Sequence, residues 1–164
     1  MLIVMMGVAG SGKTTVATAL AEALQWPLYD ADDYHAPANI AKMTRGEPLT
    51  DDDRESWLAA LAALLRAHAL ERESAILACS ALKQRYRDTL QVDASVHFVY
   101  LHGDYDLLLA RLGQRTDHFM RPEMLASQLA DLEPPRNAVV VDIRAPVADL
   151  VAEIVARLDL RPAA

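Results

Sequence analysis

The chain carries near its start an uninterrupted apolar run, Leu2-Ile-Val-Met-Met6, which leads directly into Gly7-Val-Ala-Gly-Ser-Gly12-Lys13-Thr14. A short apolar run that ends at glycine is typical of a strand buried on both faces of a parallel sheet. The second string fits G-x-x-x-x-G-K-[ST], a phosphate-loop motif that requires a strand before it and a helix after it. The residue frequencies of the chain give a chance match in roughly three of ten thousand such chains. A plain glycine turn is therefore the weaker interpretation.

Each part of this loop has an expected task. Glycines let the backbone curl until successive N–H groups point at phosphate oxygens, and the helix N-terminus adds partial positive charge. Lys13 would bridge the β- and γ-phosphates during catalysis, and Thr14 would ligate Mg²⁺. We therefore expect nucleotide phosphates and Mg²⁺ to be held by Gly7, Gly10, Ser11, Gly12, Lys13 and Thr14.

Strand-like and helical segments alternate along the rest of the chain. Strands are expected at Leu28–Asp30, Ala75–Cys79, Val96–Leu101 and Val139–Ile143, and helices at Thr14–Leu24, Thr50 to about Arg72, and about Pro146 to Leu158. This predicts an α/β fold with a central parallel sheet of about five strands. Ligands bind at the carboxyl ends of such strands. Residues from about 115 to 135 interrupt the alternation, and we expect a mobile lid there.

Length and composition limit the function classes. A chain of 164 residues predicts a single domain, 1–164, and 52% hydrophobic residues favour a sizeable core. The net charge of −7 disfavours nucleic acid as a partner. With one cysteine, Cys79, no signal-like start and no run that could span a membrane, the expected location is cytoplasmic.

P-loop proteins include small-molecule kinases, regulatory GTPases and ATP-driven machines. The chain contains neither N-K-x-D nor D-x-x-G, the strings of guanine recognition and of the GTPase switch, and it leaves little room for the oligomerisation modules of a machine. We therefore expect a kinase that uses ATP to phosphorylate a small metabolite. A nucleotide-binding regulator without turnover is the alternative from another class.

Two basic stretches in this acidic chain favour anionic ligands. Lys83 and Arg87 are four residues apart after the third strand, where they could hold an anionic acceptor on one helical face. Arg111 and Arg115 have the same spacing and lead into the expected lid, which suits them to ATP phosphates and to transition-state charge. Solvated helix faces are the structural alternative for each pair.

Carboxylates follow the second strand in the string Asp30-Ala-Asp-Asp-Tyr-His35. There Asp32 would face the same crevice as the phosphate loop and could accept a hydroxyl proton or help to hold the metal. Turn formation or helix capping is the alternative role of Asp32. His35 could contact the substrate, or it could be an ordinary solvated histidine.

Beside the phosphate loop, the chain carries a series of distinctive strings spread in order over nearly its whole length: Asp30 to His35, Asn39-Ile-Ala-Lys-Met43, Gly46-Glu-Pro-Leu-Thr-Asp-Asp-Asp-Arg54, Trp57-Leu58, Cys79-Ser-Ala-Leu-Lys83, Tyr86-Arg-Asp88, His118-Phe-Met120, Ser127-Gln128 and Leu132-Glu-Pro134. In these strings the chain resembles the gluconokinases, a small bacterial type of the P-loop kinase group that includes shikimate kinase. The resemblance implies a P-loop NTPase fold of the nucleoside-monophosphate-kinase-like type, with three layers. Two departures from the family pattern are Ala31 and Asp117, each at a position where the family often has glycine.

The resemblance implies transfer of the ATP γ-phosphoryl group to the 6-hydroxyl of D-gluconate, giving 6-phospho-D-gluconate and ADP with Mg²⁺. A related kinase of another hydroxy acid, such as shikimate, is the alternative. The nucleotide would be held by residues Gly10 to Thr15. The protein would be a homodimer. Asp32 would be the general base or orient the hydroxyl, and would share the metal with Thr14. The implied acceptor site is Asp32, His35, Arg54, Ser80, Lys83, Arg87 and His118.

Three residues within the strings that carry the resemblance also have structural interpretations. Arg54 could equally pair with the aspartates at the start of its helix. Trp57, followed by leucines at helical spacing, is expected in the core rather than in a binding stripe. Cys79 ends a buried strand, so we expect an inert thiol and not a nucleophile.

Overall fold

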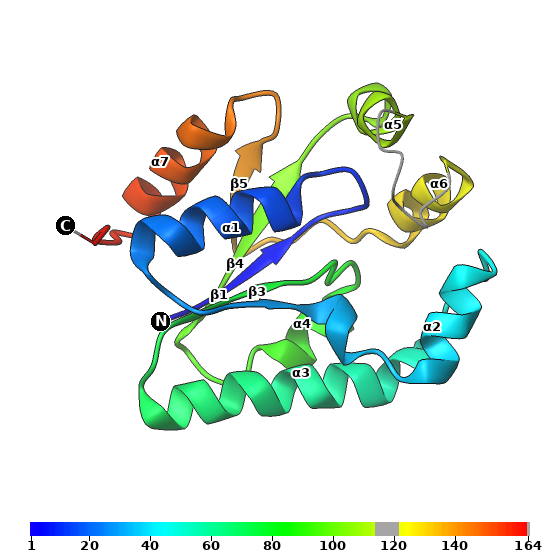
Figure 1. The fold of residues 1–164 in the computed structure, drawn as a ribbon, viewed down its shortest axis with the longest axis horizontal. Helices are drawn as coiled ribbons and strands as arrows, with labels where there is room; N and C mark the ends of the chain where they lie inside the picture. Colours follow the sequence, from blue (N-terminus) through cyan, green and yellow to red (C-terminus); the bar gives the residue numbers. More distant parts are fainter. Residues whose placement is uncertain (114–121, 164) are drawn as a thin grey trace.

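The computed structural model describes residues 1–113 and 122–163, and these residues form a five-stranded parallel sheet. The strands are β1 (Leu2–Met6), β2 (Leu28–Asp30), β3 (Ala75–Ala78), β4 (Val96–His102) and β5 (Ala138–Asp142), in the order β2-β3-β1-β4-β5. β1 lies at the centre, where Leu2 pairs with Ala75 of β3 and with Val96 of β4. The predicted α/β fold with about five parallel strands is therefore confirmed (Figure 1).

Helices cover both faces of the sheet, as Figure 1 shows. One layer contains α1 (Lys13–Leu24), α5 (Tyr105–Gly113), α6 (Pro122–Asp131) and α7 (Val147–Arg157), which share a core with Ile3 and Met5. The other contains α3 (Asp51–Glu71) and α4 (Gln84–Leu90), which pack with Leu2, Val4 and Met6. Successive β1 side chains thus enter opposite layers, as the pleat of a strand requires. Among the described residues, no helix combines the length and apolar character needed to cross a membrane.

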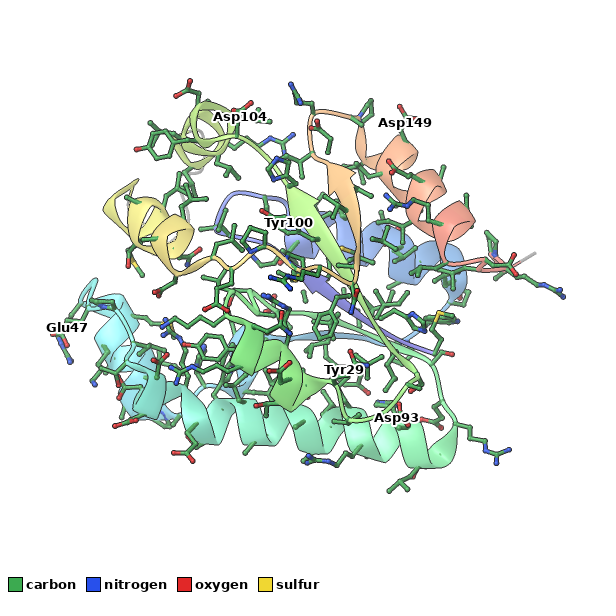
Figure 2. All side chains as sticks on the ribbon, turned by 180° about the vertical axis from the view of Figure 1, so that it is seen from behind. Tyr29, Glu47, Asp93, Tyr100, Asp104 and Asp149 are labelled. Atoms are coloured by element: carbon green, nitrogen blue, oxygen red, sulfur yellow. The ribbon has the colours of Figure 1, made fainter. Side chains whose placement is uncertain are left out.

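Side chains fill the space between the sheet and the helices (Figure 2). The Tyr29 hydroxyl of β2 lies 3.0 Å from Nε2 of His68 on α3, which ties the edge of the sheet to that helix. Asp104 accepts a hydrogen bond from the Leu107 amide at 2.9 Å at the start of α5, as expected of a cap. After β3, the helix α4 begins only at Gln84, and Lys83 is its N-cap residue.

The segment between β2 and α3 contains two elements that the sequence analysis did not anticipate. A short 3₁₀ turn, η1 (Ala31–Tyr34), is followed by α2 (Pro37–Thr44), which has proline in its first turn. At the start of α3, Thr50 Oγ1 accepts from the Asp53 amide while the Asp53 carboxylate accepts from the Thr50 amide. Lys42 Nζ lies 2.8 Å from the same carboxylate, and its hydrogen bond lowers the pKa of Asp53 to about 2. These contacts fix α2 against α3.

The segment expected to form a mobile lid, about residues 115–135, contains a helix that is packed onto the domain. Leu125 of α6 is fully buried, and Leu129 and Leu132 pack against the same core as α1. The mobility expected of this segment stays a prediction. Residues 114–121, which carry Arg115, Asp117 and His118, lie outside the described part of the chain.

Candidate active site

The phosphate loop, residues 7–14, joins β1 to α1 at the carboxyl edge of the sheet. Gly10 and Gly12 have φ values of 79° and 89°, in the left-handed region that glycine adopts without strain. A Cβ atom at Gly10 would lie only 3.1 Å from the backbone oxygen of Leu108. Both glycines are therefore required for a concave turn that ends at the N-terminus of α1, where phosphate oxygens can be bound.

Two side chains of the loop are held close to its backbone. Lys13 Nζ donates to the carbonyl oxygen of Val8 at 3.1 Å. Ser11 is fully buried, and within the described part of the chain its hydroxyl has no hydrogen-bond partner. A Cβ atom at Gly7 would lie 2.7 Å from that hydroxyl. Glycine at position 7 thus leaves room for Ser11 Oγ, a polar atom that is buried in the loop.

Thr14 and a carboxylate lie together beside the loop. Thr14 Oγ1 donates to Asp30 Oδ2 at 3.4 Å, and Asp30 Oδ1 accepts from the Asp32 amide at 3.0 Å. A hydroxyl and a carboxylate fit the preference of Mg²⁺ for a few protein oxygens with water completing its shell. The described residues contain no cluster of three or more potential metal-binding His, Cys, Asp or Glu side chains. Asp30 was missed as a metal candidate, although its place at the end of β2 was available as a signal.

A cavity of about 170 Å³ opens over the phosphate loop, with Asp30, Asp32 and Ser80 among its lining residues. Arg111 lies beside it: one of its Nη atoms donates to the Ile143 carbonyl at 2.6 Å, and the other is 3.9 Å from where a Gly12 Cβ would be. Arg111 thus lies at the loop, as expected for a phosphate ligand. Thr15 is exposed in the first turn of α1.

A second cavity of about 270 Å³ adjoins the first. Its walls come from η1, the α2–α3 segment, α3 and α6, and they include Arg54, Trp57 and Asp131. Among the described residues, Asp32, Ser80 and Gln128 line both cavities. The two cavities therefore meet at these side chains, at the carboxyl ends of β2 and β3.

His35 forms an apolar wall of this second cavity together with Trp57. Their rings are stacked, with centroids 4.5 Å apart and an interplanar angle of 10°. Trp57 Nε1 donates to the Ala31 carbonyl at 2.7 Å, so the indole is fixed from its other edge. The His35 side chain is only 5% exposed, and burial lowers its pKa despite the nearby Asp32. His35 is therefore neutral at pH 7, whereas the expected alternative was a solvated histidine.

The Asp32 carboxylate lies in the mouth between the cavities, 3.9 Å from His35 Nε2. Its side chain is 83% exposed, but it lies in a cleft where surrounding protein atoms displace bulk water. This desolvation, with the charge of Asp30 added to it, raises the pKa of Asp32 above its usual range. A carboxylate with a raised pKa at such a junction can accept a proton more readily than an ordinary aspartate.

Cations gather around Asp51, the first residue of α3. Lys83 Nζ lies 3.2 Å from the Asp51 carboxylate and 3.5 Å from that of Asp131, which lines the second cavity. Arg54 lies 3.9 Å from Asp51 and donates to the Tyr86 hydroxyl at 3.2 Å. Arg85 also pairs with Asp51. Arg54 thus has both of the contacts considered from the sequence, since it lines the cavity and also neighbours a first-turn aspartate.

Arg87 lies elsewhere, and it does not share a helical face with Lys83 because Lys83 precedes α4. It is 2% exposed and donates to the carbonyls of Ala81, Leu82 and Glu133 at 2.8–2.9 Å. It lines a separate cavity of about 770 Å³, which contains none of the described phosphate-loop residues. The structure therefore gives Arg87 a supporting role behind the β3–α4 loop.

Cys79 is buried at the end of β3. Burial raises the pKa of its thiol to about 12, so the thiol stays protonated and is a poor nucleophile. The expected inert role is consistent with this environment.

Comparisons with known proteins match this geometry. The family model described as shikimate kinase matches residues 9–162. The thermoresistant gluconokinase of Escherichia coli is 40% identical over 159 residues, which cover 94% of this chain and 91% of that protein. The crystal structure of a sugar kinase from Janibacter sp. shares 42% identity, with a TM-score of 0.90 over 98% of this chain and 95% of the other. A gluconokinase from Sinorhizobium meliloti shares 46% identity, with a TM-score of 0.86 over 96% and 90%.

Proposed function

The chain belongs to the gluconokinases within the shikimate kinase family, and from this we propose that it transfers the γ-phosphoryl group of ATP to the 6-hydroxyl of D-gluconate. The products are ADP and 6-phospho-D-gluconate. The observation that carries the proposal is the meeting of two cavities at Asp32, Ser80 and Gln128. A triphosphate on the loop and a polyol in the second cavity would have their reacting ends at this junction.

The nucleotide side of the reaction depends on charge and placement. The loop amides and the N-terminus of α1 bind phosphate oxygens, while Lys13 and Arg111 neutralise charge. Thr14 would hold Mg²⁺, with Asp30 or Asp32 contributing through its carboxylate, and a bound Mg²⁺ neutralises phosphate charge. Arg115 remains a predicted contributor of transition-state charge.

The acceptor side has a proton acceptor at one end and cations at the other. Asp32 orients the 6-hydroxyl and accepts its proton, as its raised pKa favours. Arg54 binds the carboxylate of gluconate from the cavity wall, and Lys83 adds positive charge beside the cavity through its pair with Asp131. The stacked pair of His35 and Trp57 contacts the carbon chain of gluconate. Arg87 acts indirectly, by holding the loop that carries Ser80 and Lys83. His118 remains a predicted acceptor contact.

Release of ADP, measured by a coupled assay with a panel of sugar acids and hydroxy acids, tests the proposal. We expect turnover with D-gluconate and none with shikimate. Turnover with shikimate alone would change the acceptor, and nucleotide binding without turnover on any acceptor would favour a regulator.

We also infer that the protein acts as a cytoplasmic homodimer, as its family resemblance implies. Light scattering on the purified protein measures its mass in solution. A mass close to 18.0 kDa at all concentrations would contradict the dimer.

A further inference from the structure

Gln128 on α6 connects the phosphate loop with the second cavity, which is the acceptor cavity of the proposed function. Its Oε1 atom accepts a hydrogen bond from the Ala9 amide at 2.7 Å, across 119 positions of sequence. Ala9 belongs to the phosphate loop, whose amides are the groups that hold phosphate oxygens. Gln128 also lines both cavities. The Gln128 side chain thus contacts the phosphate loop and also borders the space on either side of the junction.

Contacts along α6 and just after it hold this helix against the rest of the domain. Leu125 is fully buried in the core next to α1. At the other end of the helix, Asp131 pairs with Lys83, and the Glu133 amide donates to the Leu82 carbonyl at 3.0 Å. Ser127 and Asp131, on either side of Gln128, line the acceptor cavity but not the cavity over the phosphate loop. The helix therefore contacts the acceptor directly and reaches the nucleotide loop through Gln128.

We propose that Gln128 is a positioning residue which couples the binding of the two substrates through its hydrogen bond to the Ala9 amide. An acceptor in the second cavity restrains the Gln128 side chain, which lines that cavity, and the restrained Gln128 carbonyl holds the loop in the conformation that accepts the terminal phosphate. Coupling between two sites is reciprocal, so the nucleotide must raise acceptor affinity by the same factor. This inference rests on the proposed function, because it takes gluconate as the acceptor.

Calorimetry with a non-hydrolysable ATP analogue, with and without saturating gluconate, measures the coupling. For the unmodified protein we expect gluconate to tighten nucleotide binding at least about fivefold, a typical allosteric factor. In Gln128→Met, which keeps the length but cannot accept from the amide, the factor should fall to about one. Gln128→Glu keeps an acceptor oxygen, so it should retain the factor while the added charge weakens nucleotide binding overall.

Ser127→Ala is the matched control on the same helix. It should weaken gluconate binding but leave the coupling factor unchanged, because Ser127 lines only the acceptor cavity. Thermal unfolding of each variant verifies the fold. An unchanged factor in Gln128→Met, equal loss in Ser127→Ala, or no coupling in the unmodified protein would overturn the inference. Failure of the unmodified protein to bind gluconate at all would instead overturn the proposed function.

Discussion

Lys13 is the residue of the phosphate loop on which the proposed turnover depends most directly. Its Nζ atom is held close to the loop backbone by the Val8 carbonyl, and in the proposed phosphoryl transfer it would neutralise charge at the γ-phosphate. We expect Lys13→Ala to lower kcat at least about 10²-fold, the usual cost of losing one preorganised electrostatic contact. Coupled ADP release measures kcat, and circular dichroism should show an unchanged fold. Near-normal kcat in a folded variant would contradict this role of Lys13.

Asp32 predicts a pH dependence of the reaction. Its carboxylate accepts a proton only when ionised, and desolvation together with Asp30 raises its pKa above the ordinary value of 3.8. Activity should therefore be lost as the pH falls through this raised pKa, and the acid limb of kcat/KM should lie above pH 3.8. Asp32→Asn should lower kcat by about 10²–10⁴-fold and remove the limb. An acid limb that persists unchanged in Asp32→Asn would assign it to another group.

The β3–α4 loop depends on a buried cation, and this is a property of the element rather than of a ligand. Arg87→Ala would remove the guanidinium that donates to the carbonyls of Ala81, Leu82 and Glu133, and of these three only Leu82 keeps another described donor, the Glu133 amide. We expect the free energy of unfolding to fall by about 2–4 kcal/mol, because unpaired buried acceptors are costly. Urea unfolding measures this change. Unchanged stability with a large rise in KM for gluconate would show instead that Arg87 binds the acceptor, as its sequence spacing suggested.

α6 illustrates where an element escapes prediction from sequence. Its segment interrupts the strand and helix alternation of the rest of the chain, so no helix was predicted there, and the mobility expected of a lid stays a prediction. The helix is held by Leu125 in the core and by Gln128 at the loop. Both contacts depend on residues far away in the sequence, which a local pattern cannot reveal.

For the molecule as a whole, local signals predicted the fold and distant contacts determined the details. The apolar run of β1 and the glycines of the loop act within a few residues, and the structure has them where they were expected. The four-residue spacing of Lys83 and Arg87 did not predict how these two side chains lie. Lys83 precedes α4 and contacts Asp51, whereas Arg87 is buried. The neutral state of His35 also could not be read from sequence, since it follows from its stacking on Trp57.

The central claim is that this chain places the terminal phosphate of ATP on the 6-hydroxyl of D-gluconate. Correlated ³¹P and ¹H nuclear magnetic resonance of the reaction mixture identifies the carbon that carries the new phosphate ester. The account predicts one product, phosphorylated at C6, formed in equal amount with ADP and lost in Lys13→Ala. A phosphate on another carbon, or ADP released without any phosphorylated gluconate, would contradict it.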